Sequence, residues 1–308
     1  MSGSAEHWTP VEKTSRLKRF VKPALGLGLV ALLLSQLQPA ELFATLKSTD
    51  WQWALLGLLL ACFANLACSL RWRKIVVQMG QPLEKGPALQ LYFQGITANT
   101  VLPGGIIGGD IWRVLGLAKM GMSKTSATQS VVLDRAIGFW ALSALALAAF
   151  CAQLILSDRP WTQAPQALVV IYLLALLGMS FSPALLWWMK AKWVRGMLVP
   201  AGISLGSQLL TITAFLCCLT AVRAEFSSLA VATLCAGIFL GAVVPASIGG
   251  FGSRELASVF FLAGLGISPE AAFLASVLFG LTATAQGLLA LPSWLTRERR
   301  EERLKPKN

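Results

Sequence analysis

The chain has 308 residues, of which 56% are hydrophobic and only 13% are charged. Soluble proteins carry about 25% charged residues, so this composition excludes an ordinary water-soluble enzyme or binding domain. The formal net charge of +12 comes from lysines and arginines in the two terminal segments and in the segments between apolar runs. This spacing argues against a nucleic-acid-binding arm, and no nucleic-acid partner is predicted.

The first predicted element is a basic leader, residues 1–22, followed by an apolar stretch expected to form a first membrane span near residues 23–43. A basic leader before an apolar run is also typical of a cleaved signal peptide. The alternating charge of the later loops favours an uncleaved span. A short loop with Glu41, Lys47 and Asp50 is expected next.

Later apolar stretches are long enough to cross a bilayer, because about 20 residues at about 1.5 Å each span a hydrocarbon layer of roughly 30 Å. They are Trp51–Leu70, Ala136–Leu156, Ala167–Trp188, Met197–Ala221 and Ala271–Trp294. The pattern predicts an all-α, polytopic membrane protein whose transmembrane domain covers residues 23–295.

Lysine and arginine favour one set of loops. Of 26 such residues, 22 lie in the segments 1–22, 71–87, 103–135, 189–196 and 297–308. Basic loops remain in the cytosol, so both termini are predicted to be cytosolic and the membrane to be a plasma membrane, the bacterial inner one. The basic tail, residues 296–308, also holds glutamates and is expected to contact anionic lipid.

Tryptophan and basic residues flank the predicted spans. Trp51 and Trp53 open the second span, and the run from Arg71 to Lys74 closes it. Such residues sit at the membrane–water interface, so we interpret them as anchors and not as a site.

Two segments, near residues 88–118 and 229–267, are too short and too interrupted to be simple spans. Each has an apolar stretch, a proline, a glycine pair and then a second short helix. The expected structural breaks are Asn99, Pro103 and Pro245. Irregular backbone is tolerated in hydrocarbon only when it is buried in protein or lines a wet cavity. We therefore expect two re-entrant, broken-helix hairpins in an inverted repeat, although full crossings would also leave both termini in the cytosol.

Both breaks precede a helix amino terminus, where free N–H groups and a partial positive charge suit an anion such as phosphate. Arginine adds a planar fork for two phosphate oxygens. The candidate lipid-phosphate-binding residues are Arg113, Arg254, Gly108, Gly109, Gly249 and Gly250. The alternative is that Arg113 snorkels to the cytosolic surface and that Arg254 only pairs with Glu255.

Few acidic residues lie near the predicted spans. Asp110 follows the first glycine pair, Asp134 and Arg135 open the third full span, and Glu255 opens the second short helix. Because charges inside a membrane are costly, these groups are expected to pair with arginines, to gate the site or to exchange protons. Capping of a helix is an equally good role for Asp110 and Asp134.

The sequence contains no Walker loop, and its only histidine is His7, so no Ser–His or His–Cys pair is expected. The six cysteines lie within apolar runs without a CxxC pair. We therefore expect no catalytic set, metal, cofactor or disulfide. Polar residues in or near spans are expected to form interhelical hydrogen bonds; these are Asn65, Gln129, Gln208 and Gln286.

Four short motifs carry a family resemblance. They are Asn99–Pro103, Gly108–Arg113, Asp134-Arg135 and Pro245–Glu255. In order and spacing they resemble the lysylphosphatidylglycerol synthase/flippase transmembrane-region family over roughly residues 20–295. Asp134 departs from the pattern, because the family often has the longer glutamate there. The resemblance implies a membrane domain that handles lipids. Because the chain ends soon after its last span, without the aminoacyl-transferase domain of bifunctional members, synthase activity is not expected.

The leading hypothesis is a flippase-like translocase for an anionic phospholipid or a polyprenyl-phosphate-linked lipid. The main alternative is a non-transporting membrane partner of a lipid- or glycan-modifying enzyme. A membrane-embedded transferase is a third reading, weakened by the missing nucleophile and metal set. Homo-oligomerisation is left open.

Overall fold

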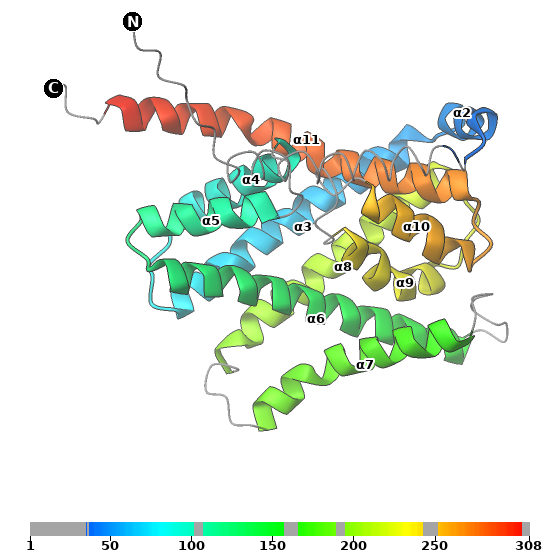
Figure 1. The fold of residues 1–308 in the computed structure, drawn as a ribbon, viewed down its shortest axis with the longest axis horizontal. Helices are drawn as coiled ribbons and strands as arrows, with labels where there is room; N and C mark the ends of the chain where they lie inside the picture. Colours follow the sequence, from blue (N-terminus) through cyan, green and yellow to red (C-terminus); the bar gives the residue numbers. More distant parts are fainter. Residues whose placement is uncertain are drawn as a thin grey trace, which may run out of the picture.

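The computed structural model describes residues 35, 37–101, 107–156, 166–188, 195–242 and 252–303. Within these residues the chain forms ten α-helices and one 3-10 turn, with no strand (Figure 1). The basic leader, residues 23–34 and 36 of the predicted first span, and the last residues of the tail lie outside the described residues. So do four predicted break or site residues, Pro103, Pro245, Gly249 and Gly250.

The helices are α2 (Pro39–Lys47), α3 (Trp51–Gln78), α4 (Lys85–Val101), α5 (Ile107–Lys119), α6 (Lys124–Leu156), α7 (Gln166–Trp188), α8 (Leu198–Ala221), α9 (Ser228–Gly241), α10 (Ser253–Ala263) and α11 (Pro269–Arg303). Four described segments are long and apolar enough to cross a membrane: α3, α6, α8 and residues Pro269–Ala290 of α11. The prediction of an all-α, polytopic membrane protein is confirmed.

Helices α3 and α8 pack antiparallel and define the two ends of the bundle. The Asp50 N–H, just before α3, donates to the carbonyl of Ala221 at the end of α8 (2.8 Å). Farther along, Gly57 lies so close to α8 that an added Cβ would be 3.1 Å from the Ala214 carbonyl oxygen. We call the end near Asp50 the Asp50 end and the opposite one, where α3 finishes, the Gln78 end.

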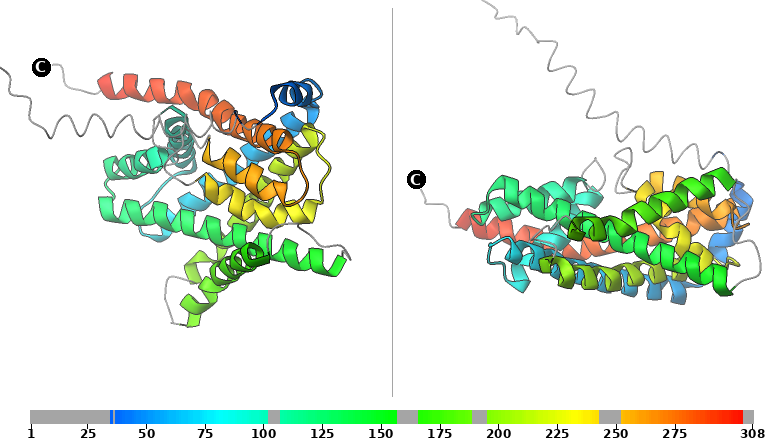
Figure 2. Two further views of the ribbon diagram at one scale, coloured as in Figure 1. Left: turned by 45° about the vertical axis from the view of Figure 1, so that its right-hand side comes forward. Right: turned by 90° about the horizontal axis from the view of Figure 1, so that it is seen from below.

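Helix α6 is covered by α5 over its first half and by α9 over its second half (Figures 1 and 2). At the Asp50 end, Ser227 before α9 donates a hydrogen bond to Gln153 of α6 (3.0 Å). Helix α7 packs outside α6, and its Tyr172 hydroxyl donates to the Thr233 carbonyl of α9 (2.6 Å). The two halves of α6 therefore support two different helix pairs.

The first of these pairs is α4 and α5. A Cβ on Gly109 of α5 would overlap the Gly95 carbonyl of α4, and one on Gly116 would overlap Leu91, so the helices run antiparallel in close contact. The chain enters this hairpin through the loop before α4 and leaves it through the loop after α5. Both loops pack around Trp72, which is fully buried near the end of α3. The hairpin therefore opens at the Gln78 end.

The second pair, α9 and α10, has the same construction at the other end. Gly237 packs against Phe261 and Gly241 against Ala257, which again requires antiparallel helices. The loop before α9 and the loop after α10, which contains Ile267, pack together beside the end of α8. The two hairpins thus open at opposite ends of the bundle, as the inverted-repeat hypothesis requires. Whether each enters and leaves the membrane on one face stays a prediction.

Three predicted boundaries are wrong. The segment expected to be a loop around Glu41 and Lys47 is helix α2. Pro39 is the first residue of this helix, a position that suits proline. Helix α3 runs on to Gln78, because Arg71 is buried and paired inside the protein and does not mark a water interface. Helix α6 begins at Lys124, so Asp134 lies inside the helix and does not cap it.

Candidate functional site

A single carboxylate joins three helices at the centre of the site. Asp134 of α6 accepts a hydrogen bond from Nε of Arg71 on α3 (2.8 Å) through Oδ1. Its other oxygen accepts from Nη1 of Arg113 on α5 (2.9 Å). All three side chains are buried, with 4% or less exposed. Asp134 therefore neutralises cations that reach it from both sides.

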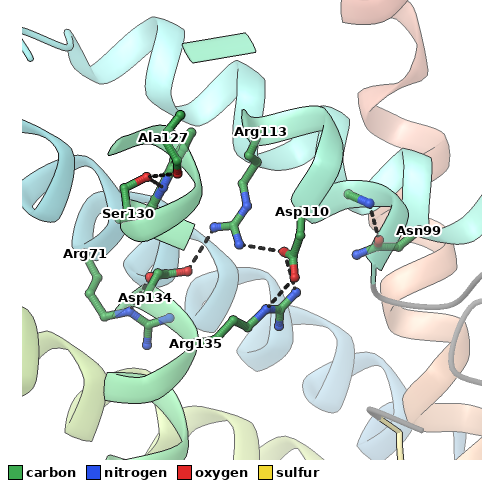
Figure 3. A network of polar contacts seen from close by, with 10 residues as sticks. Arg71, Asn99, Asp110, Arg113, Ala127, Ser130, Asp134 and Arg135 are labelled. Atoms are coloured by element: carbon green, nitrogen blue, oxygen red, sulfur yellow. Dashed lines mark hydrogen bonds and ion pairs between the residues drawn. The ribbon is translucent and has the colours of Figure 1, made fainter. Parts of the chain in front are cut away.

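A second carboxylate continues this network (Figure 3). Asp110 accepts from Nη2 of Arg113 (2.7 Å) and, through both oxygens, from Nη2 and Nε of Arg135 (2.9 and 3.1 Å). We call the set the arginine–aspartate chain; its order is Arg71, Asp134, Arg113, Asp110 and Arg135. It contains three arginines and two aspartates, which leaves one net positive charge.

Further contacts stabilise these buried cations. The Arg113 guanidinium carbon lies 5.0 Å from the ring centroid of Trp72 and 5.1 Å from that of Tyr92. Nη1 of Arg71 donates to the Ser204 hydroxyl of α8 (2.9 Å). Buried charges are tolerated only when they are paired and hydrogen-bonded, and aromatic faces attract cations. The fold thus maintains a cationic region inside an apolar bundle.

The second hairpin contributes a smaller, neutral pair. Nη2 of Arg254 donates to Glu255 (2.6 Å), and Nε of Arg254 donates to the Ser276 hydroxyl of α11 (3.1 Å). The other Glu255 oxygen accepts from the N–H of Gly252 (2.5 Å), which has a φ of +101° at the start of α10. Left-handed backbone of this kind favours glycine, so the turn before α10 depends on that residue type.

A cavity of about 290 Å³ lies between the two hairpins. The arginine–aspartate chain contributes Arg71, Asp134 and Arg135 to its wall, and the second hairpin contributes Arg254. The end of α4 adds Asn99, and residues of α3, α6, α8, α9 and α11 complete the wall. Cationic groups of both hairpins therefore face one space.

The donors on this wall are only partly used. Arg71 donates from Nε and Nη1, and Arg135 from Nε and Nη2. The remaining guanidinium nitrogen of each makes no hydrogen bond to another described residue. Such donors are what an anion in the cavity requires.

In the first glycine pair, Gly109 has a different role from the predicted one. The Gly109 N–H donates to the Asn99 side-chain oxygen (2.6 Å), so it is not free for a phosphate. Gly109 instead permits the close contact of α5 with Gly95 of α4. Gly108 lies in the first turn of α5.

The structure separates the predicted site residues into two groups. Asn99, Asp134, Arg135 and Arg254 line the cavity. Arg113, Asp110 and Glu255 lie behind its wall as ion-pair partners. Arg113 is 3% exposed, so the alternative that it snorkels to the surface is wrong. The pairing of Arg254 with Glu255, expected in the alternative reading, is present, although Arg254 also reaches the cavity.

Sequence reasoning missed Arg71, which it read as an anchor at the end of a span. One feature of the sequence could have indicated that Arg71 is buried. Hydrophobic residues such as Ile75 and Val76 follow the basic run, whereas a helix that ends at a water interface does not need them. The expected interhelical hydrogen bonding is confirmed for one pair, in which Asn65 donates to Gln286 (2.8 Å).

Comparison with protein families identifies the family of this chain. The family model described as the lysylphosphatidylglycerol synthase TM region matches residues 19–290, a range that contains the whole arginine–aspartate chain and the cavity. A search of curated proteins finds no match. The resemblance seen in the sequence motifs is confirmed.

Proposed function

The chain belongs to the lysylphosphatidylglycerol synthase transmembrane-region family, and from this premise we propose that it is a lipid translocase. In this proposal it moves an anionic or phosphate-bearing lipid between leaflets without changing it chemically. The lipid is a phospholipid or a polyprenyl-phosphate-linked lipid. The membrane is the bacterial inner membrane, with both termini in the cytosol, because of the charge bias of the loops.

The observation that carries the proposal is the unbalanced charge beside the cavity. The arginine–aspartate chain has one more cation than carboxylates, and Arg71 and Arg135 lie on the cavity wall. In a bundle of low polarity this excess favours an anionic ligand, because charge interactions are weakly screened there. A lipid phosphate is an anion available at that depth.

The dimensions favour a headgroup as the occupant. Pockets for small molecules are about 300–1,000 Å³, and the cavity of about 290 Å³ lies at the lower limit. A headgroup fits such a space, whereas two acyl chains do not. The acyl chains must therefore remain outside while the phosphate is in the cavity.

The cleanest test uses Arg135→Gln. This substitution removes the excess charge, yet Asp110 keeps its ion pair with Arg113 at 2.7 Å, so the fold is expected to persist. The purified protein is reconstituted in liposomes with fluorescent phosphatidylglycerol or a labelled polyprenyl phosphate, and leaflet exchange is followed by dithionite quenching. We expect exchange to slow at least tenfold. Arg223→Gln, which removes an exposed arginine outside the cavity, is the matched control.

Two outcomes would count against the proposal. Wild-type protein that exchanges none of these lipids rules out translocation of the lipids tested, and co-purification with a lipid- or glycan-modifying enzyme would then favour the non-transporting role. Normal exchange by folded Arg135→Gln would show that the excess charge is not needed.

A further inference from the structure

A second hollow, of about 350 Å³, lies between α5 and α6 next to the central cavity. Its wall is almost wholly apolar, and Ile111, Leu115 and Val132 are 54%, 46% and 60% exposed. We call it the α5–α6 groove; its residues are Asp110, Ile111, Val114, Leu115, Thr128, Val131, Val132 and Arg135.

The only charged residues of this groove are Asp110 and Arg135, and Arg135 also lines the central cavity. One side chain therefore belongs to both spaces. Its ion pair with Asp110 is the least buried link of the arginine–aspartate chain, since the Arg135 side chain is 37% exposed and that of Arg71 only 4%. Of the ion pairs in the arginine–aspartate chain, the Arg135–Asp110 pair is therefore the one that a ligand from outside can most easily replace.

We propose that the α5–α6 groove holds one acyl chain of a lipid while Arg135 binds its phosphate, so that the Arg135–Asp110 pair is the lateral gate of the cavity. The phosphate replaces Asp110 as the partner of Arg135. Asp110 is not left alone, because Arg113 stays within 2.7 Å of it. The role of the pair as a gate rests on the proposed function, whereas binding of the lipid in the groove does not.

Charge complementarity selects an anionic lipid as the occupant. Any apolar surface in a bilayer contacts lipid chains, but an apolar groove that ends on an arginine with a free donor prefers a chain attached to a phosphate without a compensating choline. An occupant with a cationic or zwitterionic headgroup gains less from Arg135. The prediction is therefore a difference between two lipids at one place on the surface.

The test uses photoactivatable lipids with a diazirine near the end of one acyl chain. Full-length protein is reconstituted in vesicles with either the phosphatidylglycerol or the phosphatidylcholine probe, irradiated, and the adducts are mapped by mass spectrometry. We expect at least fivefold more adducts on Ile111, Leu115 and Val132 from phosphatidylglycerol. At Leu209 of α8, which is 56% exposed outside the groove, both probes should label equally.

Two variants sharpen the comparison. Arg135→Gln should abolish the preference for phosphatidylglycerol in the groove. Val132→Trp should reduce the number of adducts in the groove, because the larger side chain fills the groove. Size-exclusion chromatography verifies that each variant is folded. Equal labelling of the groove by both probes in wild-type protein would overturn the inference, because it would describe ordinary surrounding lipid.

Leaflet exchange measured in the same vesicles separates this inference from the proposed function. A lipid preference in the groove without exchange would support the groove and reject translocation. Exchange without such a preference would support translocation and reject the groove.

Discussion

Arg71 of α3 and Asp134 of α6 form an ion pair, with Nε 2.8 Å from Oδ1, although 63 residues separate them and their side chains are 4% and 2% exposed. Asp134 simultaneously holds Arg113 of α5. One carboxylate therefore links two membrane-crossing helices to the first hairpin, and the stability of the bundle should depend on it.

Replacing Asp134 with Asn should destabilise the protein strongly. The substitution leaves Arg71 and Arg113 buried without their shared carboxylate, and breaking a buried pair costs about 3–5 kcal/mol. Thermal unfolding in detergent should show a clearly lower midpoint. Asp50→Asn is the control, because the Asp50 side chain accepts one hydrogen bond, from the N–H of Gln52, and Asn caps a helix about as well. A stable Asp134→Asn protein would mean that the arginines are neutralised elsewhere.

Glycine at position 109 should be required for the packing of the first hairpin. A Cβ there would overlap the Gly95 carbonyl and the Asn99 side chain, so Gly109→Ala must separate α4 from α5. Overpacking of this kind costs about 1–3 kcal/mol. Gly86→Ala in the same hairpin is the matched control, because nothing lies within 4 Å of its added Cβ. Equal unfolding midpoints for the two variants would contradict the close contact.

Asn99→Asp should separate stability from transport. Asp retains an oxygen for the Gly109 N–H, so the unfolding midpoint should change little. It also adds a negative charge to the cavity wall, which cancels the excess of the arginine–aspartate chain. Under the proposed function, exchange of phosphatidylglycerol should slow about tenfold, equivalent to about 1.4 kcal/mol. Gln52→Glu, which adds the same charge at an exposed site outside the cavity, should leave exchange unchanged.

Bilayer thickness explains why so much of the fold could be predicted from the sequence. A helix that crosses hydrocarbon needs a minimum apolar length, and α3, α6, α8 and α11 each contain such a run. Two interruptions are predicted because proline and glycine pairs do not suit a helix interior, but the first glycine pair, Gly108 and Gly109, lies within α5. That the hairpins open at opposite ends followed from the loop charges and agrees with their packing against α3 and α8.

The partners within the site could not be predicted in the same way. Hydropathy treats Arg71 as the end of an apolar run, whereas its burial depends on Asp134, a residue from another helix. Asp134 itself looked like a helix start because the apolar stretch begins after it, yet α6 begins at Lys124. Ion pairs between helices depend on which helices pack together, and the residues close to Arg71 or Asp134 in the sequence do not indicate this.

The opposed hairpins give a topological prediction. Lys124 is exposed at the start of α6, at the Gln78 end, and Glu225 is exposed after α8, at the Asp50 end. If the bundle crosses the membrane between these ends, single cysteines at the two positions must lie on opposite sides. Lys124→Cys and Glu225→Cys are made in a background without the six native cysteines and treated with a membrane-impermeant maleimide on intact spheroplasts.

Only Glu225→Cys should react from outside, because the basic loops around Lys124 are expected in the cytosol. Lys124→Cys should react fully once the membrane is permeabilised, which controls for its accessibility. Labelling of both positions from the same side would place both hairpin openings on one face. It would reject the inverted arrangement, and with it a path in which the headgroup passes from one hairpin to the other.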